Sequence, residues 1–327
     1  MCGENWCHHD PTSDLRVERR RSGLSLIEML VAISITSMLI ALLMPAVHSS
    51  RESARRMQCA SNLKQIGVSL FNYESTYGCL PTGYWHKYDL LPYLEQSDLA
   101  AIMKSEFAAP TGGVPTFISR VIPIYTCPSD SAPKVIGDSV TRVGTTNYVA
   151  CSGTGIQRDG FNGMFNLGWD YNDMRGGNVR LSDVTDGLSN TLAMSEALHA
   201  TVTVNDSCHE RLRAVWELPT RLTGPTELDQ FADACEALPP YPAQFGYIGR
   251  IHKGVPWYVG DSGAGMYNHV LTPNRPSCTN GGAVQYGCFT ATSGHITGVN
   301  VLYGDGRVSF ISTSVDRSVW RDMGSRY

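Results

Sequence analysis

Residues 21–33 read Arg-Ser-Gly-Leu-Ser-Leu-Ile-Glu-Met-Leu-Val-Ala-Ile, and this stretch decides how the chain folds. An apolar run begins at Leu24, directly after Ser22 and Gly23, and Glu28 is its single early charge. Residues 29–47 then carry no charge. The length of this stretch is close to the roughly 20 apolar residues that a membrane-spanning helix needs. Because a carboxylate in such a run is costly in lipid, Glu28 is a candidate functional residue that needs a partner.

Three interpretations of this stretch compete. A secretory signal peptide has an apolar core of about 7–15 residues followed by a small-residue cleavage site, whereas here the run is longer and the small residues precede it. An ordinary signal anchor explains the length but gives no role to Glu28 or to the junction of Gly23 and Leu24. Third, the basic flank, glycine, apolar run and acid resemble the amino-terminal motif of type IV pilins and type II secretion pseudopilins.

That resemblance implies a processing pathway and a location. A prepilin peptidase/N-methyltransferase would cut between Gly23 and Leu24 and methylate Leu24, so residues 1–23 are a leader that is removed. Glu28 would then act in assembly by contacting another pilin-like subunit through the amino-terminal helix. The chain would pass once through the cytoplasmic (inner) membrane with its globular domain outside the cytoplasm, and it could reach a filament at the cell surface.

The helix is expected to extend well beyond the membrane, over residues 24–78. Pro45 predicts a kink between the spanning half, 29–47, and an amphipathic half, because proline removes one helical hydrogen bond. Apolar residues recur at helical spacing through the second half and predict one buried stripe. The stripe consists of Cys59, Leu63, Ile66, Leu70, Tyr73 and Tyr77. Gly78 provides the stop signal.

The remainder of the chain, residues 79–327, is expected to be a globular α+β domain outside the cytoplasm, and the composition of the whole chain indicates its character. The chain has 327 residues, 32 glycines and 17 prolines, which favours a loop-rich body containing strands. Its net charge is −4 and its body has no basic stripe with interleaved aromatics, so we expect no nucleic-acid partner. Residues 299–311 predict a β-hairpin around the turn Gly304-Asp305-Gly306. Residues 198–290 lack a clear period and are interpreted as a variable surface insertion.

Ten cysteines occur, and the cut would remove Cys2 and Cys7. An even number remains, which is compatible with disulfides in an exported chain, although several free buried cysteines are the alternative. Their connectivity cannot be deduced from the sequence, and the local guesses are the pairs Cys208 with Cys235 and Cys278 with Cys288. No C-x-x-C motif is present, and the leader cluster Cys7-His8-His9 would be discarded, so we expect neither a metal nor a cofactor.

Further blocks resemble prepilin-like proteins with the H-x9-DG processing-associated carboxyl-terminal domain. They are Arg55–Cys59, Asn62–Gly67, Leu91–Gln96, Cys127–Asp130, Asp186–Thr191, Glu196, and finally His295 followed after nine residues by Asp305 and Gly306. The family motif is thus His295, Asp305 and Gly306. The resemblance implies an α+β pilin-like fold, with a long kinked helix packed on an antiparallel sheet.

Catalytic and calcium-binding interpretations are weaker. Ser293, His295 and Asp305 have the residue types of a hydrolase triad, but an extended chain would separate His295 from Asp305 by roughly 30 Å, and no G-x-S-x-G elbow occurs. Calcium ligands could come from acids in loops, but no EF-hand spacing supports them. Those acids are Asp130, Asp183, Asp186 and Asp305. We therefore expect no enzyme, but a structural subunit of a pilus or of a type II secretion pseudopilus-like structure. The alternative is a membrane-tethered binding module that is processed but does not polymerise.

Overall fold

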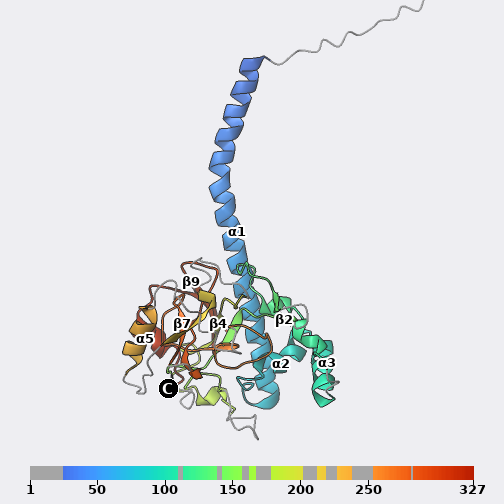
Figure 1. Ribbon diagram of the computed structural model, residues 1–327, viewed down its shortest axis with the longest axis vertical. Helices are drawn as coiled ribbons and strands as arrows, with labels where there is room; N and C mark the ends of the chain where they lie inside the picture. Colours follow the sequence, from blue (N-terminus) through green and yellow to red (C-terminus); the bar gives the residue numbers. More distant parts are fainter. Residues whose placement is uncertain are drawn as a thin grey trace, which may run out of the picture. The chain divides into compact units, whose positions relative to one another are not determined.

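The computed structural model describes residues 25–109, 113–137, 142–156, 162–166, 178–201, 212–218, 227–237, 253–280 and 283–327. The chain divides into two units, Met1–Arg51 and Glu52–Tyr327. One helix, α1 (Leu26–Tyr77), contains the boundary between them (Figure 1). The architecture is α+β and pilin-like: a long apolar amino-terminal helix followed by a body with mostly antiparallel sheets.

The first half of α1 is apolar and exposed on all sides. Every residue from 25 to 50 is exposed, including Leu26, Met38 and Leu42 at 66–79%. By length and composition this helix could cross a membrane. A helix that is apolar all round needs an apolar environment. The α-helix continues through Pro45, and the kink there stays a prediction.

The second half of α1, from Glu52 onward, packs with the body. Four members of the predicted stripe, Cys59, Leu63, Ile66 and Leu70, are at most 5% exposed, and Tyr73 is half-buried. The prediction is wrong for Tyr77, which is 61% exposed, because the helix ends there. Gly78 follows with a φ of +71°, a left-handed conformation that glycine adopts without a steric cost.

A five-stranded sheet packs against this half of the helix. Its order is β10-β9-β4-β3-β6, antiparallel except for the pair β3 and β6. The strands are β3 (Tyr148–Cys151), β4 (Leu192–Glu196), β6 (Met266–Tyr267), β9 (Gly298–Tyr303) and β10 (Val308–Ser312). Leu302 belongs to the core that contains the helix stripe, whereas Val301 belongs to a second core with Trp320, as alternation along a strand requires. The predicted hairpin at 299–311 is confirmed as β9 and β10.

The remaining elements surround this sheet. The helical ones are α2 (His86–Asp89), η1 (Leu91–Leu94), α3 (Ser97–Ala108), η2 (Thr116–Ser119), η3 (Pro123–Tyr125), η5 (Leu181–Asp183), α5 (Leu228–Glu236) and α6 (Arg317–Asp322). Strands β1 (Val135–Gly137) and β2 (Arg142–Gly144) pair with each other. Strands β5 (Val215–Leu218), β7 (Ser277–Asn280) and β8 (Ala283–Cys288) form a three-stranded sheet.

The expectation of a surface insertion at 198–290 is wrong for much of what the structure describes there. Strand β6 is part of the central sheet, and Trp257 and Tyr267 are at most 1% exposed. The structural reason is that this segment contributes core through a two-residue strand and single buried aromatics. Such short pieces leave no periodicity in the sequence.

Candidate functional site

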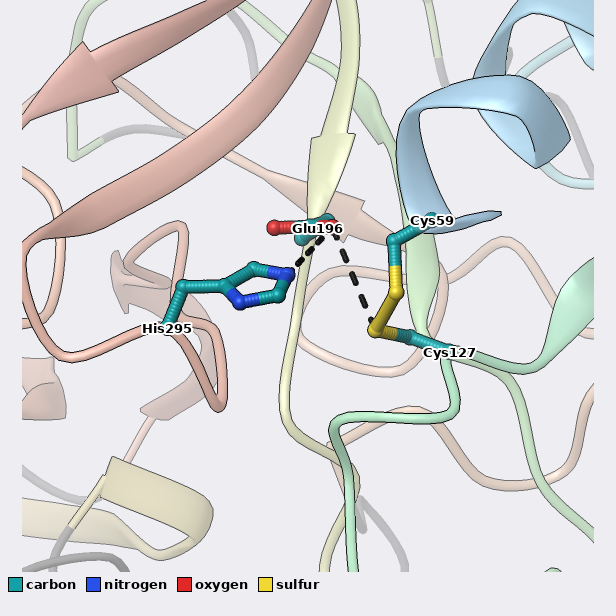
Figure 2. A group of neighbouring side chains, drawn as sticks. All are labelled: Cys59, Cys127, Glu196 and His295. Atoms are coloured by element: carbon teal, nitrogen blue, oxygen red, sulfur yellow. Dashed lines mark hydrogen bonds and ion pairs between the residues drawn. A yellow bond between two sulfur atoms is a disulfide. The ribbon is translucent and has the colours of Figure 1, made fainter. Parts of the chain in front are cut away.

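Four side chains from distant parts of the chain meet beside the second half of α1 (Figure 2). Cys59 comes from the helix, Cys127 from the turn after η3, Glu196 from the end of β4 and His295 from the segment before β9. We call these four residues the Cys-Glu-His cluster. One sulfur, oxygen or nitrogen atom of each lies within 4.8 Å of those of the others, and all four residues are buried.

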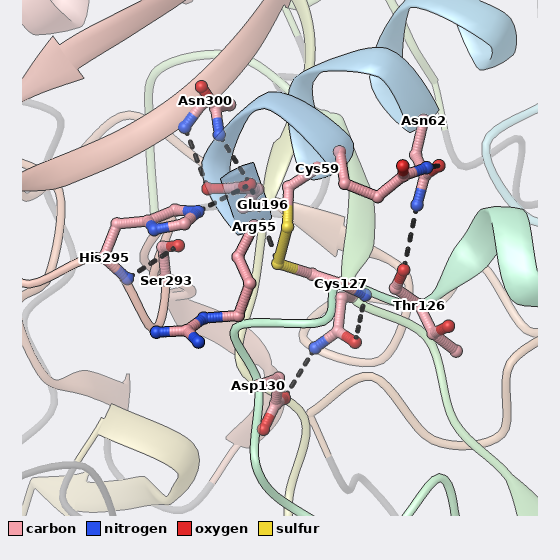
Figure 3. The surroundings of a disulfide bond; sticks show 12 residues. Arg55, Cys59, Asn62, Thr126, Cys127, Asp130, Glu196, Ser293, His295 and Asn300 are labelled. Carbon is pink, nitrogen blue, oxygen red and sulfur yellow. Dashed lines mark hydrogen bonds and ion pairs between the residues drawn. A yellow bond between two sulfur atoms is a disulfide. The ribbon is translucent and has the colours of Figure 1, made fainter. Parts of the chain in front are cut away.

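A disulfide joins Cys59 to Cys127, with 5.2 Å between the Cα atoms (Figure 3). A second disulfide joins Cys235 to Cys278. The expected pair of Cys278 with Cys288 is therefore wrong, as is that of Cys235 with Cys208, because sequence proximity does not decide pairing. Although Cys278 and Cys288 are opposite each other on β7 and β8, Cys288 stays a free buried thiol. Cys208 lies outside the described residues.

Glu196 supplies a buried carboxylate, and Asn300 of β9 holds it. The backbone N–H and the side-chain amide of Asn300 donate to its two oxygens at 2.9 and 2.8 Å. Burial raises the pKa of the Glu196 carboxyl, although His295 and Asn300 favour its charged form. Cys127 Sγ lies 4.0 Å from Glu196 Oε1, so the carboxylate faces the disulfide.

His295 lies between two carboxylates. Its Nδ1 is 2.6 Å from Glu52 Oε1 on α1, and its Nε2 is 3.8 Å from Glu196 Oε1. The Nε2 atom is buried and has no hydrogen-bond partner among the described residues. Partial burial acts to raise the pKa of Glu52, but hydrogen bonds from His295 and Arg55 outweigh it and lower that pKa. The imidazole therefore connects the helix to the sheet.

The other part of the family motif contacts the same helix farther along. Lys64 Nζ donates to the carbonyl of Gly306 at 2.7 Å, and Gly306 has a φ of +81°. A Cβ at Gly306 would lie 2.6 Å from the ring of Phe71, so only glycine fits this turn. Glu52 and Lys64 are 12 residues apart, about 18 Å along a helix. His295 and Gly306 thus hold the helix at two separate points.

The candidate triad is not assembled by the contacts of the described residues. Ser293 Oγ accepts a hydrogen bond from the His295 backbone, while Asp305 Oδ1 accepts from the Arg307 backbone within its own turn at 2.8 Å. Asp183 likewise accepts from the backbone N–H of Arg180. These contacts give both aspartates local structural roles.

A buried network positions Cys127. Its backbone N–H donates to the side chain of Asn147 at 2.9 Å, and Asn147 donates to Asp130 at 2.6 Å. Asp130 also contacts Arg213 and His199. Burial acts to raise the pKa of Asp130, but Arg213 and His199 outweigh it and lower the pKa to about 2. Asp130 is thus a structural carboxylate, bound to the Arg213 guanidinium and to the His199 ring.

We expect acid to weaken this network within a defined pH window. A carboxyl whose pKa is lowered to about 2 in the folded state, from about 3.9 in the unfolded chain, stabilises the fold above that unfolded value. This stabilisation, about 2 kcal/mol, is lost as the pH falls from 4 towards 2. Denaturant unfolding at several pH values should show a shallower pH dependence for Asp130→Asn than for the wild type. An exposed control, Asp98→Asn, should keep the wild-type slope; equal slopes for all three chains would contradict the assignment.

Glu28, the acid near the amino terminus, has a local partner. Its Oε2 accepts a hydrogen bond from the backbone N–H of Ser25 at 2.7 Å. It lies in the first turn of α1, where a carboxylate favourably meets the free N–H groups of a helix. Gly23 and Leu24 lie outside the described residues.

Comparison with known proteins gives two family matches. The family described as "Protein of unknown function (DUF1559)" matches residues 48–318, and the prokaryotic N-terminal methylation motif matches residues 19–44. The second match includes Gly23, Leu24 and Glu28. A search of the curated proteins and a search of the solved structures found no match.

Proposed function

The chain belongs to the DUF1559 family and carries a prepilin-type methylation motif, and from this premise we propose that it is a pilin-like structural subunit. A prepilin peptidase removes residues 1–23 and methylates Leu24. The processed chain is held in the cytoplasmic membrane by residues 29–47, with Glu52–Tyr327 outside the cytoplasm. It then joins a pilus or a type II secretion pseudopilus-like structure.

One observation carries this proposal. The methylation motif at residues 19–44 overlaps the half of α1 in which every described residue is exposed and most residues are apolar. In water this surface would be unfavourable, since each Å² of apolar area left in water costs roughly 25 cal/mol. The membrane covers this apolar surface first, and neighbouring helices cover it after assembly. A filament subunit passes through these two environments in this order, first the membrane and then the helices of its neighbours.

Glu28 has a specific part in the assembly step. Among the described residues, its carboxylate accepts a hydrogen bond from one backbone N–H, that of Ser25 at an exposed helix end. The amine of Leu24, which cleavage creates, offers a full positive charge on a neighbouring subunit. Two opposite charges that leave water together offset part of the cost of burying either one alone. Glu28 thereby sets the register between adjacent helices.

The experiment that tests the proposal is mass spectrometry of the amino terminus, combined with shearing of cells. We expect the purified chain to begin at a methylated Leu24 and to appear in the sheared surface fraction. A chain that begins at Met1 or at an unmethylated residue would contradict the processing. A methylated chain that stays wholly with the membrane would favour the tethered binding module over the filament subunit.

Replacing Glu28 should separate processing from assembly. We expect Glu28→Ala to be cleaved and methylated like the wild type but to be reduced at least tenfold in the sheared fraction, because about 1.4 kcal/mol of lost pairing already gives a factor of ten. Ser34→Ala, which removes another polar group of the same apolar segment, is the matched control and should assemble normally. Normal assembly of Glu28→Ala would rule out the pairing role.

A further inference from the structure

We propose that the Cys-Glu-His cluster, in its dithiol form, binds one Zn²⁺ ion. The ligands are Cys59 Sγ, Cys127 Sγ, one carboxylate oxygen of Glu196 and Nε2 of His295 (Figure 2). The disulfide and the metal would both join α1 to the turn after η3, and the metal would also bind the end of β4 and the segment before β9.

The ligand set and its geometry suit zinc. Zinc takes four ligands from cysteine, histidine and acidic side chains, at about 2.0–2.3 Å. A tetrahedron of that size places its ligand atoms roughly 3.3–3.8 Å from one another. In the cluster the four atoms already lie within 4.8 Å, while both sulfurs are held in a disulfide. Opening that bond frees the two sulfurs to rotate, so side-chain movements of about 1 Å complete the tetrahedron.

The imidazole of His295 is arranged as in a metal site. Its Nδ1 faces the Glu52 carboxylate at 2.6 Å, and its Nε2 points into the cluster without a hydrogen-bond partner among the described residues. Histidines that bind a metal usually donate their second ring N–H to a carboxylate, which fixes the tautomer and the ring orientation. Leaving a buried polar nitrogen unsatisfied has a cost, and a metal at Nε2 would remove it. This observation is independent of the two cysteines.

The carboxylate ligand is supported in the same way. Asn300 donates to both oxygens of Glu196, which fixes the plane of the carboxylate facing His295 and Cys127. Each oxygen keeps a lone pair that Asn300 does not use, because a carboxylate oxygen can accept two bonds. Glu52 and Asn300 would therefore be the outer partners of two metal ligands.

The change between the two forms balances in electrons and protons. Two molecules of a thiol reductant become one disulfide and supply two electrons and two protons, which break the Cys59–Cys127 bond and leave two thiols. Binding of Zn²⁺ then displaces both thiol protons to water, because thiolates are the ligands. The second disulfide, Cys235–Cys278, belongs to no such group among the described residues and serves as the internal control.

The test uses the full chain in detergent micelles. After reduction by dithiothreitol and its removal without oxygen, the chain is titrated with Co²⁺, whose thiolate charge-transfer absorption reports sulfur ligands, and then with Zn²⁺. We expect Cys59→Ser/Cys127→Ser to bind one ion fewer per chain than the wild type, and Cys235→Ser/Cys278→Ser to bind the same number. Without reduction, the cluster should give no thiolate charge-transfer absorption, because both of its sulfurs remain in the disulfide.

A second variant keeps the test valid if the double serine variant fails to fold. Glu52→Gln leaves all four ligands in place and changes a half-exposed residue, so we expect the same stoichiometry with an affinity reduced about 10- to 100-fold. Glu74→Gln, on the same helix, is its control and should bind like the wild type. Zinc should also raise the unfolding temperature of the reduced wild type. The proposal is overturned if the reduced wild type shows no thiolate-bound cobalt, if both double variants bind alike, or if the reduced chain unfolds and zinc does not restore it.

Discussion

A chain carrying Gly23→Val is expected to accumulate as the uncut precursor, with processing close to abolished. With the proposed cut directly after Gly23, a glycine would let the backbone approach the peptidase without a Cβ, and a branched side chain there would remove that freedom. The precursor keeps its 23-residue leader, so an immunoblot should show an unshifted, larger band, and mass spectrometry should find no methylated Leu24.

The matched control for this result is Ser22→Ala, one residue before Gly23. It keeps the glycine and the basic flank, and we expect normal processing. Efficient cleavage of Gly23→Val after residue 23 would show that the recognition of this chain does not depend on the glycine. The assignment of residues 1–23 as a leader would then need another basis.

Loss of the Cys59–Cys127 disulfide should lower the free energy of unfolding more than the loss of a buried cysteine that forms no disulfide. The bond closes a loop with a sequence separation of 68, and the chain-entropy relation gives a loss of about 4 kcal/mol when it is removed. Denaturant unfolding of the full chain in micelles, followed by tryptophan fluorescence, should show this fall for Cys59→Ser/Cys127→Ser in the absence of added metal.

Cys79→Ser is the control for this comparison, because Cys79 is also buried but forms no disulfide. We expect it to cost about 1 kcal/mol, typical of a single buried substitution. Equal losses in the two variants would mean that the disulfide contributes no more than ordinary packing. The difference between them, less about 1 kcal/mol for the second buried substitution, therefore measures what the covalent link adds.

Local signals in the sequence were sufficient for the helix and the hairpin. The stripe from Cys59 to Leu70 follows the helical period, Gly78 ends the helix, and the Asp305-Gly306 turn determines the pairing of β9 with β10. These features depend on neighbours in sequence, where backbone geometry alone relates pattern to structure. The membrane-spanning stretch is likewise predicted from a local pattern, its run of uncharged, mostly apolar residues.

The Cys-Glu-His cluster could not be assembled in this way. Cys59 fits an apolar stripe equally well as a core residue or as a disulfide partner, and its partner lies 68 residues away. The contact of His295 with Glu52 joins residues separated by 243 positions, and Glu52 has no distinguishing local pattern. Long-range contacts of this type depend on how the sheet docks on the helix, which a single sequence does not encode in any periodicity.

The disulfide between α1 and the turn after η3 also decides how the protein carries mechanical load. When the chain is stretched from its ends, tension reaches Cys59 and crosses the sulfur–sulfur bond to Cys127, so the residues between them bear none of it. The separation of 68 residues shortens the extensible chain by roughly 220–240 Å at 3.3–3.6 Å per residue. A subunit pulled by its amino-terminal helix therefore keeps Leu63 and Ile66 in a segment that force cannot unravel until the bond is reduced.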